Sequence, residues 1–169
     1  YSGVVLFKDG LPLPDFTGTY SGSLVEPSSD PNTLYALNNA HTGAEFFKVG
    51  VSETGVRTLS TKSALLGGYN HRMKSEGDVI YGSSGTAVRG DLMSVEGSFP
   101  VTEIRTHEYW SSGFEWDVEP ETAKQRVYFN GPRSLYAFDA KSHLPIRSVR
   151  LLDEHQGAAT QSLERWGSD

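Results

Sequence analysis

The sequence contains no cysteine, and this absence excludes several kinds of structure and chemistry. A chain without thiols cannot form a disulfide framework, a zinc–thiolate site or a cysteine nucleophile. The sequence also lacks any apolar run that approaches the roughly 20 residues of a membrane-spanning helix. We therefore expect a core held together by packing and hydrogen bonds, and we expect no insertion into a membrane.

Positive charge is scarce as well. Lysine and arginine number 15 against 21 aspartates and glutamates, which gives a formal net charge of -6. Non-specific binding to nucleic acid and docking on anionic membranes both need clustered basic residues. The charge balance therefore argues against both partners. No nucleophile elbow, phosphate-binding loop or dinucleotide fingerprint is present, and the five histidines show no metal-ligand spacing, so we predict no metal or cofactor from them.

The sequence does contain short apolar and aromatic runs separated by turn residues. The stretch 113–151 shows them most clearly, because four runs are punctuated there by glycine, proline, asparagine and aspartate. Such a pattern predicts a four-stranded antiparallel meander with a turn over 119–122. The predicted strands are Phe114–Val118, Arg126–Phe129, Leu135–Asp139 and Ile146–Leu151.

The meander recurs along the chain. Tyr35, Tyr81 and Tyr128 lie in similar short runs, and their numbers differ by 46 and 47. This period is typical of propeller blades with four strands each. The fold class we predict is therefore an all-β propeller, as one domain or propeller segment over 1–169 and as a partial ring or a small four-bladed ring. The complete blades are expected at about 22–61, 65–101 and 113–151, with partial units at 1–20 and 161–169.

Two details of the partial units follow from the same pattern. In the first unit we expect a strand at Val4–Phe7, an interruption of pairing by Pro12 and Pro14, and a closing strand at Phe16–Tyr20. In a ring of four blades, Leu163–Trp166 would pair beside Val4–Phe7.

Blades cover one another on both faces, so their inner strands should be apolar without strict alternation. We expect six side chains to be mostly buried between blades: Tyr35, Tyr81, Val127, Phe129, Tyr136 and Phe138.

The third repeat resembles a known repeat. Glu119-Pro120, followed by Arg126–Phe129 and Leu135–Asp139, is similar to the repeat of YVTN-type bacterial propellers. Leu163–Asp169 resembles a strand of similar repeats in secreted multidomain bacterial proteins. The resemblance implies a propeller, often seven-bladed, in an extracellular or cell-surface protein, and it implies no catalytic residue. The middle repeat departs from it, because Arg89-Gly90-Asp91 stands where an apolar run should end in aspartate.

Carboxylates at every second position form one candidate site: Glu115, Asp117, Glu119 and Glu121. Two of them on one strand face could perform acid–base chemistry or bind Ca²⁺. The favoured interpretation is a solvated strand edge that runs into a turn. Ser28–Asn32 also offers oxygen atoms for Ca²⁺, but without the spacing of a dedicated loop, so we predict a plain turn. Arg89-Gly90-Asp91 matches a cell-adhesion tripeptide, which recurs by chance.

Loop residues form a second candidate site. In a propeller, the loops between the second and third strands and those between blades share one face of the disc. An aromatic, histidine and amide rim there suits a polar ligand such as a glycan, although loop composition alone explains it equally well. His143 should lie on the opposite face. The candidate ligand-binding residues are His41, His107, Tyr109, Trp110, Asn130, Arg133, Glu154 and His155.

Two functions remain open. The first is a non-enzymatic extracellular interaction module that binds a protein or glycan, or forms part of a larger assembly. Its exposed blade faces would be covered by the rest of the same polypeptide or by other copies of the chain. The alternative is an extracellular polysaccharide hydrolase or lyase that uses Glu115, Asp117 or Glu154.

Overall fold

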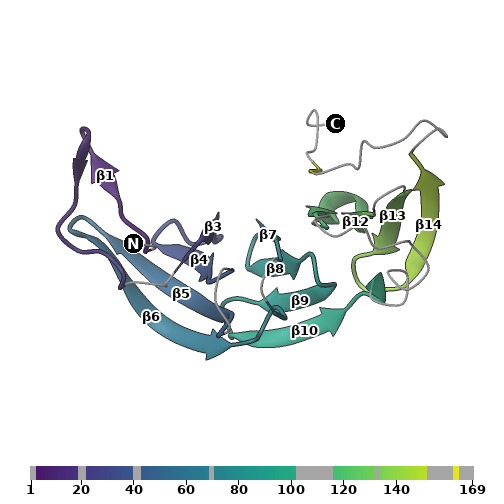
Figure 1. The fold of residues 1–169 in the computed structure, drawn as a ribbon, viewed down its shortest axis with the longest axis horizontal. Coiled ribbons are helices and arrows are strands. Elements are labelled where there is room, and N and C mark those ends of the chain that lie inside the picture. The colour runs from purple at the N-terminus through teal and green to yellow at the C-terminus, as the bar shows by residue number, and fades with distance from the viewer. Residues whose placement is uncertain are drawn as a thin grey trace.

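The computed structural model describes residues 3–18, 22–39, 43–68, 71–101, 116–131, 134–151 and 162–163. Within these ranges the chain forms three four-stranded antiparallel sheets and one two-stranded hairpin. Figure 1 shows the sheets side by side along an open arc, with the first strands on the concave side and the fourth strands at the outer rim. This arrangement confirms the predicted all-β propeller architecture as a partial ring. The alternative of a closed four-bladed ring is wrong.

Each sheet has its four strands in sequence order. The first sheet consists of β3 (Leu24–Pro27), β4 (Thr33–Leu37), β5 (Glu45–Ser52) and β6 (Gly55–Ser63). The second sheet consists of β7 (Met73–Glu76), β8 (Val79–Gly82), β9 (Thr86–Arg89) and β10 (Ser94–Ser98). The third sheet consists of β11 (Val118–Glu121), β12 (Arg126–Asn130), β13 (Ser134–Asp139) and β14 (Pro145–Arg150).

The first strand of the third sheet lies later than predicted. The sequence pattern placed it at 114–118, whereas β11 starts at Val118 and continues through Pro120 to Glu121. A short 3₁₀ helix, η1 (Thr122–Lys124), then makes the turn. Proline is tolerated because β11 is an edge strand and pairs only with β12, so Pro120 needs no N–H toward a second neighbour.

The N-terminal hairpin also differs from the prediction. β1 (Phe7–Lys8) pairs with β2 (Leu11–Pro12), and Pro12 stands opposite Phe7 instead of interrupting the pairing. The adjacent bond from the Leu13 N–H to the Leu6 carbonyl, 2.8 Å, shows why. In an antiparallel ladder, only every second pair of opposite residues exchanges N–H···O bonds. Pro12 and Phe7 form a pair without such bonds, so the missing N–H of Pro12 costs no hydrogen bond. The predicted closing strand is wrong in its described part, because Phe16 is in no strand.

Packing between neighbouring sheets makes the core. Five of the six side chains predicted to be buried are confirmed: Tyr35, Tyr81, Val127, Phe129 and Phe138. Tyr136 is only partly buried and stacks on Trp116 with ring centroids 6.1 Å apart.

Three apolar clusters account for this burial. One joins the first sheet to the second, and another joins the second sheet to the third. In the remaining cluster, Val4 packs with Ala36 and Val49, so the N-terminal segment covers the other face of the first sheet. Every sheet therefore depends on a neighbour for burial of its apolar face.

The outer strands carry one shared feature. The pairing of β6, β10 and β14 with their inner neighbours shifts register once in each sheet. Such bulges twist an edge strand and oppose edge-to-edge aggregation. Among the residues that the structure describes, no helix is long and apolar enough to cross a membrane.

Phe129 provides a test of the core. Its side chain is fully buried, and its ring centroid lies 5.3 Å from that of Phe99, which follows the last strand of the neighbouring sheet. Substitution Phe129→Ala should therefore lower the free energy of unfolding by about 3–5 kcal/mol through lost burial and a cavity. Urea denaturation measures this loss. Leu92→Ala at an exposed position is the control, and its effect should stay within about 0.5 kcal/mol. A small loss for Phe129→Ala would contradict the packing described here.

Candidate functional site: polar contacts between neighbouring sheets

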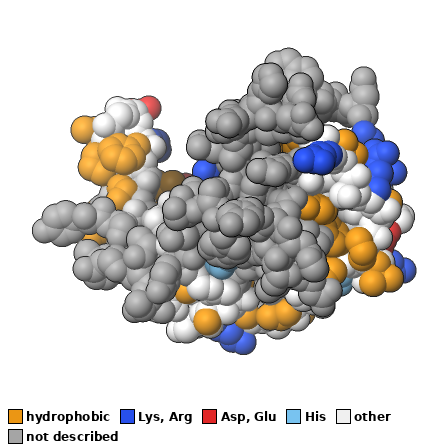
Figure 2. All heavy atoms as spheres, turned by 45° about the vertical axis from the view of Figure 1, so that its right-hand side comes forward, with side chains coloured by type: hydrophobic (Ala, Val, Ile, Leu, Met, Phe, Trp, Pro, Cys, Tyr) orange, Lys and Arg blue, Asp and Glu red, His pale blue; other side chains and the backbone are white. Residues whose placement is uncertain are grey.

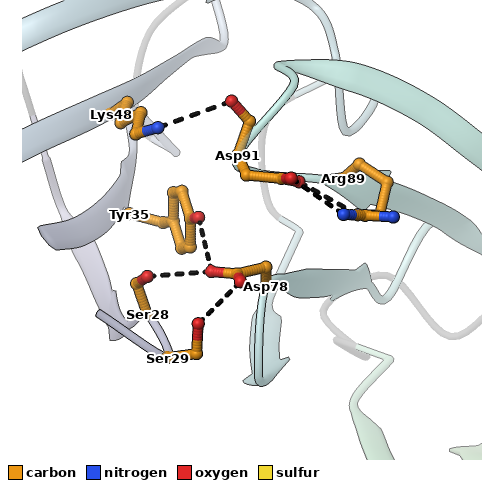
Figure 3. A network of polar contacts seen from close by, with 7 residues as sticks. All are labelled: Ser28, Ser29, Tyr35, Lys48, Asp78, Arg89 and Asp91. Carbon is orange, nitrogen blue, oxygen red and sulfur yellow. Dashed lines mark hydrogen bonds and ion pairs between the residues drawn. The ribbon is translucent and has the colours of Figure 1, made fainter. Parts of the chain in front are cut away.

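The carboxylate of Asp78 is the centre of a polar network between the first and second sheets. It accepts hydrogen bonds from the Ser28 hydroxyl at 2.9 Å and the Ser29 hydroxyl at 2.6 Å. It also accepts one from the Tyr35 hydroxyl at 3.1 Å. Figure 3 shows these three donors converging on Asp78 from the first sheet. Both serines lie in the turn after β3, and Asp78 lies in the equivalent turn after β7, so the network joins two turns at the same end of their sheets.

These contacts favour the ionised form of Asp78. The pKa of the Asp78 carboxyl is lowered below its ordinary value of 3.8. The largest cause is the hydrogen bond from Ser29, followed by the hydrogen bond from Ser28, while desolvation opposes the shift. Burial raises the pKa of the Tyr35 hydroxyl, which therefore remains a proton donor to Asp78. The network is thus a charge-assisted contact between blades at neutral pH.

The adhesion-like tripeptide is a structural turn. Arg89 donates from Nε and Nη2 to the two carboxylate oxygens of Asp91 at 2.9 and 2.8 Å, so the two charged groups pair with each other. Between them, Gly90 packs against Tyr35 of the first sheet, and a Cβ at this position would collide with the Tyr35 ring and with Ile80. Lys48 of the first sheet donates to the Asp91 carbonyl at 3.4 Å. Figure 3 places the whole turn beside the Asp78 network.

A second set of polar contacts lies at the opposite ends of the sheets, where second strands end and first strands begin. Asn130 accepts a hydrogen bond from the Asp117 N–H through its side-chain oxygen. In the second sheet, the Ser83 hydroxyl accepts one from the Arg72 N–H at 2.9 Å in the same place. Each contact holds the start of a first strand against the end of the second strand of the same sheet.

Asp117 is buried, with 2 % of its surface exposed, so the predicted solvated edge is wrong at this residue. Its carboxylate accepts hydrogen bonds from the N–H groups of Val118 and Leu163, each at 2.9 Å. Arg72 of the second sheet lies 4.0 Å away. The reason for the error is that Asp117 lies just before β11, where its carboxylate is enclosed by Val118, Leu163 and Arg72.

Glutamates on the first strands make a further contact between sheets. Glu26 on β3 accepts from the N–H of Ser75 on β7 at 3.1 Å. Glu76 on β7 accepts from the N–H of Thr122 at 2.8 Å. Carboxylates of one sheet therefore satisfy backbone donors of the next. The sequence analysis missed this arrangement, although a glutamate a few residues before each of the repeat tyrosines Tyr35 and Tyr81 was a visible signal.

Most residues of the predicted ligand-binding rim lie outside the described ranges: His41, His107, Tyr109, Trp110, Arg133, Glu154 and His155. Asn130 is described, and its side chain is fully buried beside Asp117. Its role in binding a ligand stays a prediction. His143 lies in the turn between β13 and β14, where its ring packs against Phe99 at 4.7 Å. Glu115 also lies outside the described residues.

The predicted turn at Ser28–Asn32 is confirmed. Asp30 accepts hydrogen bonds from the Asn32 N–H and the Thr33 hydroxyl, each at 2.9 Å. The first of these bonds is the main reason that the pKa of Asp30 is lowered. Across the described part of the chain, no cluster of three or more metal-ligating side chains occurs.

Comparisons with known proteins support the architecture. A scan against protein families and a search of curated proteins found no match. Solved structures of similar fold include the WD40 repeats of RRP9 and the structure of U3-55K. Each has a TM-score of 0.53 and 9 % sequence identity, and each alignment covers 88 % of this chain. The chain spans about two fifths of their length, 41 % and 42 % respectively.

The fold and these likenesses together define the class of the protein. It is a β-propeller repeat chain, present here as three complete blades and a hairpin in an open arc. At this level of identity the similarity establishes the fold alone.

Gly90 tests the contact between the first two sheets. Gly90→Ala should lower the free energy of unfolding by about 1–3 kcal/mol, because the added methyl group overlaps the Tyr35 ring. Thermal or urea denaturation measures the change. Gly68→Ala is a matched control, since nothing lies within 4 Å of a Cβ there. Equal effects of the two substitutions would show that Gly90 is not packed as described.

Asp78 tests the electrostatic part of the same contact. Its folded-state pKa is lowered, so its contribution to stability is present at neutral pH and is lost as the pH falls through the acid range. In urea melts between about pH 6 and pH 2, Asp78→Asn should therefore flatten the loss of stability on acidification. Asp9→Asn, at an exposed hairpin turn, is the control for the loss of one carboxylate. An unchanged slope for Asp78→Asn would contradict the network.

Proposed function

We propose that this chain is a non-enzymatic protein-interaction module built from propeller blades. The observation that carries the proposal is the exposure of apolar side chains on its open arc. The most exposed large ones include Phe7 and Leu11 on the N-terminal hairpin and Leu144 next to β14. Apolar surface of this kind marks sites where proteins associate.

The outer strand of the third sheet offers one such surface. Ile146 and Val149 on β14 are exposed, and Arg147 and Arg150 stand between and beside them. Figure 2 shows hydrophobic side chains next to lysine and arginine on this side of the molecule. Apolar side chains with arginine are typical of protein interfaces, where lysine and acidic residues are depleted.

The N-terminal hairpin offers another surface. In Figure 2 its hydrophobic side chains stand clear of the sheets at the upper left. A protein surface is the occupant that suits these groups, either from the rest of the same polypeptide or from other copies of the chain. Completion of the propeller is thus part of the proposed interaction role.

Chemistry at Asp117 argues against the hydrolase or lyase alternative. The carboxylate is buried and accepts hydrogen bonds from two backbone N–H groups, so it is not exposed to a substrate. An extracellular or cell-surface location, and a glycan as a further ligand, are parts of the proposal that rest on the resemblance to YVTN-type secreted propellers.

Protein and glycan arrays probed with the full chain test this function, followed by turnover assays on every ligand bound. We expect a protein ligand that is bound and left unchanged. If the β14 surface is the interface, Ile146→Asp should weaken this binding by about tenfold or more. If the predicted ligand-binding rim is the interface, Trp110→Ala should weaken it by a similar factor. Leu59→Asp on β6 is the exposed control. Cleavage of a bound polysaccharide would overturn the proposal.

A further inference from the structure

β14 is an edge strand with a free row of backbone groups. Within the described part of the chain it pairs with β13 alone, and Figure 1 shows it at the outer rim of the third sheet. All six of its residues, Pro145–Arg150, are exposed. Alternate N–H and C=O groups of such a strand point away from the sheet, so they can pair with an added strand.

The open end of the arc does not account for this exposure. β6 and β10 belong to sheets whose two faces are both covered, yet most residues of these two strands are exposed as well. An outer strand of this fold therefore stays accessible when its sheet has neighbours on both faces.

The N-terminal segment already pairs with an outer strand in this way. Asp15 lies beside the start of β6 in a parallel bridge with Gly55. The Asp15 carbonyl accepts a hydrogen bond from the Val56 N–H at 3.0 Å, and the Asp15 N–H donates to the Thr54 carbonyl at 2.9 Å. The Asp15 carboxylate also accepts one from the Thr54 hydroxyl at 2.6 Å. An outer edge of this fold thus accepts an extended acidic segment through main-chain bonds.

β14 is less protected against pairing than the other two outer strands. In β10 the register shift lies in the middle of the strand, at Glu96. In β6 the stretch after the shift, Ser60–Ser63, carries hydroxyl groups and a lysine. In β14 the shift lies at the start, so Arg147–Arg150 pairs without interruption, and this stretch includes the apolar Val149. Bulges and lysine oppose the addition of a strand, whereas a regular edge with apolar side chains permits it.

Charge indicates what this edge binds. The hairpin of β13 and β14 contains three basic residues, Lys141, Arg147 and Arg150, and one acidic residue, Asp139, although the whole chain has a net charge of -6. The Asp139 carboxylate serves its own turn, where it accepts hydrogen bonds from the Ser142 N–H at 2.7 Å and from the Ser142 hydroxyl at 2.8 Å. The β14 edge is therefore a basic strip on an acidic protein, and it suits an acidic segment.

Arg147 and Arg150 define the spacing of the acidic groups. They are three positions apart, so their side chains lie on opposite faces of the strand. An added strand meets both when two of its carboxylates are also three positions apart, with an apolar residue between them opposite Val149. A second copy fits poorly, because antiparallel pairing centred on Ser148 and Val149 would set Arg147 of one copy opposite Arg150 of the other.

We propose that the outer edge of β14 binds an extended acidic segment of a partner protein, which adds to the third sheet as an outermost strand. Main-chain hydrogen bonds hold the segment, and its two carboxylates meet Arg147 and Arg150. This mode of binding rests on the proposed function of an interaction module, and it gives that module a class of partner.

Two fluorescent peptides test the charge pattern by fluorescence anisotropy with the full chain. One contains Glu-Val-Thr-Glu between threonine flanks, and the other has glutamine in place of both glutamates. The glutamate peptide should bind about fivefold more tightly or better at low salt, because its carboxylates pair with the two arginines. The double variant Arg147→Gln, Arg150→Gln should lose this preference.

The matched control is the double variant Arg57→Gln, Lys62→Gln, which removes two exposed positive charges from β6 and should keep the preference. Equal binding of the two peptides, or no binding of either, would overturn the proposal. A preference that survives Arg147→Gln, Arg150→Gln would overturn it as well.

N-methylation of the glutamate peptide tests the strand pairing itself. In an added strand, alternate N–H groups face β14 and the others face solvent. Methyl groups on one alternate set of amides should therefore abolish binding, and methyl groups on the other set should leave it within about twofold. Equal effects of the two sets would show that charge alone attracts the peptide, and this result would overturn strand addition.

Failure at β14 can be told apart from failure of the proposed function. If the arrays yield a protein that the full chain binds and leaves unchanged while neither peptide binds, strand addition is overturned and the interaction module stands. Cleavage of a bound polysaccharide overturns the module itself. A dimer of the full chain that Val149→Asp dissociates, measured by sedimentation velocity, would assign the edge to a second copy and overturn the proposal.

Discussion

Face-to-face burial between neighbouring sheets is the constraint on which the rest of this structure depends. A single four-stranded sheet has two faces, and each needs a neighbour if its apolar side chains are to leave water. Tyr35 and Phe46 of the first sheet are buried only because the second sheet covers them. The two inner strands of each sheet are consequently apolar, and the outermost strands remain exposed. Stability is shared between blades instead of residing in any one of them.

Apolar packing alone does not set the spacing of the blades, because the hydrophobic effect has no direction. Directional contacts at the strand ends supply that information. At one end, hydroxyl groups of the first sheet converge on Asp78 of the second. At the other, Arg72 of the second sheet lies 4.0 Å from the carboxylate of Asp117, which precedes the first strand of the third sheet. Carboxylates suit this task, since their two oxygens accept several hydrogen bonds and charge-assisted bonds are stronger than neutral ones. Asp117, which looks like a catalytic candidate in the sequence, therefore holds separate segments together.

The errors in the sequence-based prediction have a common physical origin. The sequence pattern predicts β11 too early because proline usually interrupts strands, yet an edge strand tolerates Pro120. The same reason applies to Pro12, which stands opposite Phe7 in the N-terminal hairpin. Asp117 was expected in water because aspartate is usually exposed, whereas three segments that are distant in sequence enclose it. Each error depends on which strands and side chains surround a residue in the folded protein. A local sequence pattern contains no information about those contacts.

Strand content, the repeat and its period were determined by the sequence itself, because a strand needs only a few consecutive apolar residues between turn signals. The regular return of Tyr35, Tyr81 and Tyr128 was enough to predict blades, with a partial ring and a small four-bladed ring both left open. Only the tertiary structure decided which polar side chains join neighbouring sheets and what they hold. Those contacts join residues such as Ser29 and Asp78, 49 positions apart, and they form only when folding has brought two separate sheets together.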